Sequence, residues 1–172
     1  MASHLEFEQW VRFPIERVFA FFSNPENLPR VMPQASATKV TAINRIPPPP
    51  LSAGIANDEA AGVGTTIVTT FRIFPALPFR ASWIARITEF EWNHFFADVQ
   101  DKGPFKNWHH RHEFVEQARD GVPGTFVRDV IDYEVGFSFV GTMANSLLVR
   151  RQMEGTFVER QQRLPQLLAQ QL

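Results

Sequence analysis

The feature that most constrains this chain is a run of six strand-like segments followed by one long helical segment. The six segments span residues 37–46, 63–74, 79–91, 94–101, 105–117 and 125–135. From about Gly141 to Leu164 the apolar residues follow helical spacing, and Pro165 is expected to kink or end that helix. Six successive antiparallel strands cannot bury both faces of a large sheet, so the helix is expected to cover one of them.

The segment before this run predicts one more strand and two short helices. Residues 4–11 alternate between apolar and polar side chains, which indicates a strand. A helix is expected to begin at Pro14, and a second one at Pro25 with Asn24 as its N-cap. The 172 residues therefore predict a single α+β domain over residues 1–172, with a curved seven-stranded antiparallel sheet around the C-terminal helix. Such a helix cannot close tightly on a curved sheet, so an elongated cavity is expected between them.

Composition narrows the range of partners. The chain has 17 Phe but a single Tyr, so much aromatic surface without a polar group must be buried or line an apolar space. The net charge of −1 gives no reason to expect nucleic acid as a partner. The absence of Cys excludes disulfides and thiolate metal sites, and it fits a cytoplasmic protein. We expect no signal peptide and no membrane span, because neither the N-terminus nor any other segment is apolar enough.

Three stretches resemble the START-like superfamily, also called SRPBCC or Bet v 1-like. Phe13–Pro33 is similar to its helix pair, while Gly103–Phe114 and Gly124–Val135 are similar to a Trp-x-His-x-His-x-Phe strand and its Gly-Thr-x-x-x-Asp-x-x-x-Tyr partner. The chain departs from that subgroup at Val135–Gly141, where Leu-Pro-Phe-Gly is common. The resemblance implies a helix-grip fold. It also implies a function among lipid carriers, hormone receptors and polyketide aromatase/cyclases, without selecting one of them.

A polar cluster is expected on the inward faces of the last two strands. Strand alternation puts Trp108, His110, His112 and Phe114 on one face of residues 105–117, and Val127, Asp129, Ile131 and Tyr133 on one face of residues 125–135. Paired strands lie about 5 Å apart, so an imidazole can reach a carboxylate across them. Three interpretations remain open: a structural His–Asp pair, a group that orients a ligand, or an acid–base catalyst using His110, His112, Asp129 and Tyr133.

A metal site is a further alternative. His110 and His112 point the same way, and Asp129 could be a third ligand. No further His or Cys is placed to complete such a site, so the sequence predicts no tightly bound transition metal and no cofactor.

Aromatic residues and the last helix supply the other candidate ligand contacts. Rings at Phe71, Trp83, Phe95, Trp108 and Phe114 are expected to line the pocket, although each of them could instead be ordinary core. Leu147 and Arg151 are the candidates from the helix. Arg150 or Arg151 could meet a ligand carboxylate, extend to solvent or pair with an acidic side chain.

These observations favour a monomeric or homodimeric protein that binds or carries a hydrophobic small molecule, such as a lipid, an isoprenoid or an aromatic polyketide-like compound. The alternative is an aromatase/cyclase or dehydratase that uses the inward cluster. A third hypothesis is a structural module whose cavity is incidental.

Overall fold

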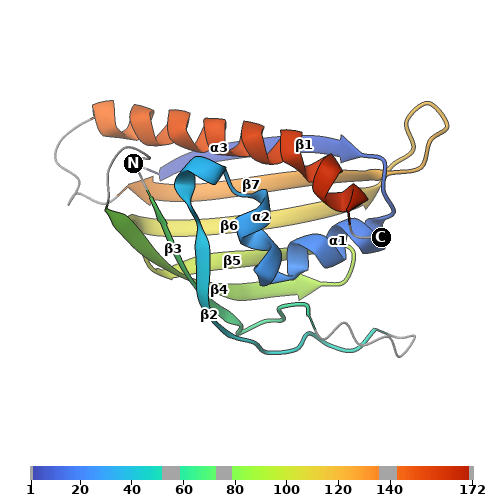
Figure 1. The fold of residues 1–172 in the computed structure, drawn as a ribbon, viewed down its shortest axis with the longest axis horizontal. Helices are drawn as coiled ribbons and strands as arrows, with labels where there is room; N and C mark the ends of the chain where they lie inside the picture. Colours follow the sequence, from blue (N-terminus) through green and yellow to red (C-terminus); the bar gives the residue numbers. More distant parts are fainter. Residues whose placement is uncertain (1, 52–58, 73–78, 136–142, 171–172) are drawn as a thin grey trace.

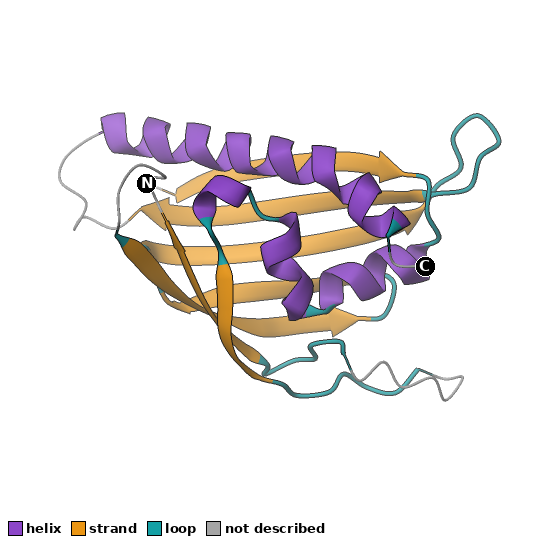
Figure 2. Ribbon diagram, in the orientation of Figure 1, coloured by secondary structure: helices purple, strands orange, loops and turns teal. Residues whose placement is uncertain are grey.

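A computed structural model of the chain describes residues 2–51, 59–72, 79–135 and 143–170. Figure 1 shows a long helix and two short helical segments on one side of a broad sheet, and Figure 2 separates helices from strands by colour. The elements are β1 (Ala2–Val11), α1 (Ile15–Ser23), η1 (Pro25–Asn27), α2 (Leu28–Val31), η2 (Gln34–Ser36), β2 (Lys39–Asn44), β3 (Thr66–Arg72), β4 (Arg80–Glu91), β5 (Phe95–Lys102), β6 (Phe105–Glu116), β7 (Thr125–Val135) and α3 (Met143–Ala169).

The sheet has seven strands in the order β1-β7-β6-β5-β4-β3-β2, and all neighbouring pairs are antiparallel. The last strand, β7, thus lies between β6 and the first strand, β1. This arrangement confirms the predicted seven-stranded antiparallel sheet. Register between β6 and β7 is set by a two-residue turn in which Asp120 and Gly121 both have positive φ, 52° and 75°. This turn places His112 directly opposite Asp129.

The N-terminal helices begin where the sequence predicts. Pro14 precedes the first residue of α1, and Glu16 lies in its first turn. The Asn24 side chain accepts a hydrogen bond from the backbone N–H of Glu26, at 3.0 Å, and Pro25 occupies the first position of η1. These two breaks turn the chain twice, so that α1 and α2 cover the part of the sheet that α3 leaves open (Figure 1).

Helix α3 differs from its prediction, because it continues through Pro165 to Ala169. The carbonyl of Gln161, which would accept from residue 165, instead accepts a hydrogen bond from the side-chain amide of Gln9, at 2.7 Å. The missing backbone donor therefore leaves no unsatisfied acceptor. The predicted helix start near Gly141 and the predicted strand end at Phe74 lie outside the described residues.

The core has two parts. The larger lies between α1, the last turns of α3 and the sheet, and is centred on Val18, Phe19 and Leu168, which are fully buried. The smaller lies under the middle of α3 and contains Leu5, Ile131, Tyr133 and Phe157. Within the described ranges, no helix has both the length and the apolar character needed to cross a membrane.

Candidate functional site

A cavity of about 370 Å³ lies between the sheet, α3 and the α1–α2 segment. This volume falls in the range of small-molecule binding sites. Its wall is largely apolar and includes the rings of Phe21, Phe22, Phe71, Trp83, Phe96, Phe105, Trp108 and Phe157. Its ionisable lining groups are Arg72, Asp98, His110, His112 and Arg160. An apolar wall with a few polar groups gathered in it fits a ligand that is mostly apolar and has one polar part.

Strand register brings the polar groups together. Asp98 on β5 lies directly opposite His110 on β6, and His112 lies directly opposite Asp129 on β7. All four side chains point to the inward face, because residues at even spacing along a strand share a face. His110, His112 and Asp129 are each buried. The cluster is therefore assembled from three adjacent strands.

Asp129 lies behind both imidazoles. Its Oδ1 is 2.9 Å from Nε2 of His110 and 2.6 Å from Nδ1 of His112. The bond to His110 is well aligned, whereas Nδ1 of His112 is close to the carboxylate but out of line for a hydrogen bond. We still place a proton on that nitrogen, because two bare lone pairs would repel each other at 2.6 Å.

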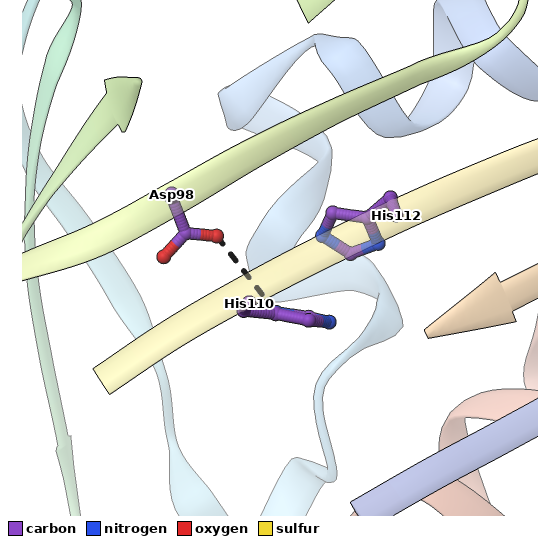
Figure 3. Close-up of side chains that lie close together, drawn as sticks. All are labelled: Asp98, His110 and His112. Atoms are coloured by element: carbon purple, nitrogen blue, oxygen red, sulfur yellow. Dashed lines mark ion pairs between the residues drawn. The ribbon is translucent and has the colours of Figure 1, made fainter. Parts of the chain in front are cut away.

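Asp98 approaches the same imidazoles from β5, which flanks β6 on the side away from β7, and Figure 3 shows its carboxylate directed at His110. Its Oδ2 lies 3.8 Å from Nδ1 of His110, which is too long for a hydrogen bond. Its Oδ1 accepts a hydrogen bond from the indole N–H of Trp108, at 3.3 Å. Asp98 is thus oriented by Trp108 and aimed at the imidazole pair.

Burial changes the pKa values of these groups in different directions. Burial, with the neighbouring His112, lowers the pKa of His110 to about 4, so this imidazole is neutral near pH 7. Burial raises the pKa of Asp98. Burial alone would raise the pKa of Asp129 too. His112, Arg160 and the imidazole hydrogen bonds outweigh burial and hold the pKa of Asp129 well below its usual range.

Arg160 on α3 is the cationic member of the site, and sequence reasoning missed it. Only 8% of the residue is exposed, and its guanidinium carbon lies 4.4 Å from the centre of the Phe157 ring. No carboxylate oxygen of the described residues lies within ion-pair distance of it, although Asp98 and Asp129 feel its charge. The signal that could have found it is its helical spacing from Phe157 and Thr156, which are the apolar and small residues of the same face.

The structure brings five of the predicted ligand contacts to the cavity wall: Phe71, Trp83, Trp108, His110 and His112. Phe114 is inward as expected, but it packs in the core against Phe19, with ring centres 5.1 Å apart. Ile131 and Tyr133 are also inward and belong to the smaller core. Asp129 lies behind the two imidazoles and is not in the wall of the main cavity.

Three predicted contacts lie elsewhere. Phe95 is on the opposite face of β5, under the guanidinium of Arg111, and Phe96 takes the inward position. Leu147 and Arg151 are exposed and do not line the cavity, whereas Val149 and Met153, which are less exposed, do line it. The errors on β5 and on α3 have the same cause. Two adjacent Phe residues, or consecutive apolar residues on a helix, do not by themselves fix which one faces inward.

Residues 11–161 match the family described as polyketide cyclase / dehydrase and lipid transport. A search of curated proteins found no significant match. Among solved structures, TTHA0849 from Thermus thermophilus is similar with a TM-score of 0.68 and 15% identity, over 97% of each chain. A START superfamily protein from Mycobacterium smegmatis is similar with a TM-score of 0.63 and 14% sequence identity, over 98% of this chain and 99% of that one. Norcoclaurine synthase from Thalictrum flavum is similar with a TM-score of 0.61 and 14% sequence identity, over 99% of this chain and 88% of that one.

Proposed function

The chain belongs to the polyketide cyclase / dehydrase and lipid transport family, and from this premise we propose that its cavity binds or carries an elongated, mostly apolar small molecule. One observation carries the proposal: a cavity of about 370 Å³ is walled by aromatic rings and contains few charged groups. Burying apolar ligand surface against such a wall contributes about 25 cal/mol per Å² before the costs of binding are subtracted.

The polar part of the ligand lies at Arg160 and the imidazoles. A buried guanidinium without a carboxylate within ion-pair distance, among the described residues, has N–H donors to offer a ligand. A carbonyl, hydroxyl or carboxylate oxygen at one end of the molecule would accept from it. We expect the apolar part of the ligand to lie along Trp83, Phe71 and Phe105, which line the same cavity.

A cavity-filling substitution tests the proposal. Ala85 on β4 lines the cavity, and Ala85→Phe should reduce binding of the fluorescent probe 1-anilinonaphthalene-8-sulfonate about tenfold or more. Ser82→Phe, at an exposed position on the other face of the same strand, is the matched control and should leave binding unchanged. Thermal melts establish that both variants are folded. Undiminished binding by a folded Ala85→Phe variant would refute the proposal, and native mass spectrometry of the wild type would identify a co-purified ligand.

A second candidate function is proton transfer in a cyclase or dehydratase reaction. The observation that favours it is the carboxylate of Asp129 behind His112, which is the arrangement of an oriented general base. Exchange of the methyl protons of acetophenone in D₂O, followed by NMR, would test it. Exchange above the buffer rate that disappears in His112→Ala is the expected result, and exchange equal to that in buffer would exclude this activity for simple ketones.

A further inference from the structure

Three side chains on the cavity wall have the composition of a metal site. Asp98, His110 and His112 each offer one ligand atom, and these atoms all lie within 4.8 Å of one another. Figure 3 shows the carboxylate of β5 and the two imidazoles of β6 facing a common space. We propose that these three residues bind a divalent transition metal ion, with Zn²⁺ as the best-fitting probe. This proposal does not depend on the apolar ligand.

The proton positions leave acceptor atoms that face one another, an arrangement that a cation can satisfy. Asp129 requires a proton on Nε2 of His110 and on Nδ1 of His112. In their neutral forms the two rings therefore present lone pairs at Nδ1 of His110 and Nε2 of His112. Asp98 adds a carboxylate oxygen 3.8 Å from Nδ1 of His110. Three acceptors converge, and none of them has a proton to give to the others while Asp98 is ionised.

The groups behind the three ligands are those that orient metal ligands in proteins. Histidine ligands of metals usually donate their second ring nitrogen to a carboxylate, and here one carboxylate, Asp129, serves both rings. The indole of Trp108 holds Asp98 in the same way, at 3.3 Å. The far side of the site is the cavity, so a water molecule or the polar end of a ligand could complete the coordination.

Distances and charge are compatible with a small dication. With metal–ligand distances near 2.1 Å, tetrahedral ligand atoms are about 3.4 Å apart, so the three ligand atoms, now within 4.8 Å of one another, must move closer when the ion binds. Two carboxylates, Asp98 and Asp129, offset the charge of Arg160 and of part of the metal ion. Burial raises the pKa of Asp98, and a metal ion bound to this carboxylate would oppose that effect of burial.

The site differs from the one weighed in the sequence analysis, which took Asp129 as the third ligand and expected no metal. An inward Phe95 would turn Asp98 to the outer face by strand alternation, whereas the structure turns Phe96 and Asp98 inward and the β5–β6 register brings Asp98 opposite His110. Asp129 then takes the role of an orienting group.

Titration of metal-stripped, untagged protein with ZnCl₂ by calorimetry is the direct test. We expect about one Zn²⁺ per chain, release of protons on binding, and affinity at least about tenfold weaker in the isosteric variant Asp98→Asn. Co²⁺ in place of Zn²⁺ should give visible absorption bands of a four- or five-coordinate ion, which Asp98→Asn and His112→Ala lose. The Co²⁺ spectrum reports directly on the side chains that coordinate the ion, and it does not require a measurement of enzymatic activity.

Two controls address other sites. His109→Ala removes an imidazole from the opposite face of β6, and His4→Ala removes the surface imidazole beside Asp132 and Glu6. Both variants should bind Zn²⁺ like the wild type. Binding of much less than one ion per chain, binding unchanged by Asp98→Asn, or binding lost in His4→Ala would each overturn the proposal. Folding of each variant is checked by circular dichroism, and Asp98→Ala replaces Asp98→Asn if the latter does not fold.

Discussion

The side-chain amide of Gln9 on β1 donates a hydrogen bond to the backbone carbonyl of Gln161 on α3, at 2.7 Å. Pro165 has no N–H for that carbonyl, so a residue of the edge strand replaces the missing donor. The side chain of Gln161 in turn donates to the carbonyl of Glu8, at 3.1 Å. These two bonds fix the last turns of α3 on the sheet, beside the cavity end that contains Arg160.

This relationship predicts a coupling between Gln9 and Pro165. Gln9→Ala should lower the free energy of unfolding by about 1 kcal/mol, because a carbonyl loses its partner. In a Pro165→Ala background the loss should shrink toward zero, since the new backbone N–H can serve Gln161. Urea denaturation of the wild type, both single variants and the double variant measures the coupling. Equal losses in both backgrounds would show that Gln9 does not replace the donor.

The second prediction concerns Asp129. Asp129→Asn should lower the free energy of unfolding by about 3–5 kcal/mol while retaining the fold, because two buried imidazoles lose their charged partner. Asp132→Asn is the matched control: Asp132 is exposed on the same strand and pairs with a surface imidazole, His4, so its loss should cost less than about 1 kcal/mol. Thermal and urea denaturation measure both. A nearly neutral Asp129→Asn would mean that the carboxylate is solvated.

The third prediction concerns acid sensitivity. The pKa of His110 is about 4 in the folded protein and 6.5 without burial, so between these values only the unfolded chain binds this proton. Stability should therefore fall as pH drops from 6.5 to 4, by about 3 kcal/mol from this group. Asp98 acts in the opposite direction, because burial raises its folded pKa.

A comparison of the wild type with a variant that lacks this imidazole isolates the contribution of His110 to the pH dependence of stability. The free energy of unfolding is measured from about pH 7 to about pH 4.5 in the wild type and in His110→Gln, which removes this titration while Asp98, His112, Asp129 and Arg160 remain. The variant should have the flatter profile in this window. Parallel profiles would show that His110 is protonated in the folded protein as readily as in the unfolded chain.

The fourth prediction contrasts two glycines. A Cβ at Gly155, in the middle of α3 and exposed, would meet nothing within 4 Å, so Gly155→Ala should stabilise the protein by about 0.5–1 kcal/mol. A Cβ at Gly124 would lie 2.5 Å from the carbonyl oxygen of Val11 and 2.5 Å from the ring of Trp10. Gly124→Ala should therefore destabilise it. Melting temperatures of the two variants should move in opposite directions, and a shift of the same sign in both would contradict this reading of the packing.

Much of the fold could be predicted because it depends on local patterns. The order of strands and helices, the caps at Pro14 and Asn24, and the inward face of β6 and β7 all follow from the identity of near neighbours in sequence. Strand alternation has a period of two residues, so Trp108, His110 and His112 have to share a face once β6 forms. The half of the site that β6 contributes was therefore contained in the sequence.

The other half depends on packing that local sequence patterns do not determine. Asp98 joins the cluster through the register of β5 on β6, and Arg160 joins it through the rotation of α3 about its own axis. Nothing near Phe95 and Phe96 decides which of the two rings is buried, and a long helix with polar residues on several sides does not define its own inward face. Tertiary packing decides both, because the energy of burial depends on what each side chain meets across the cavity.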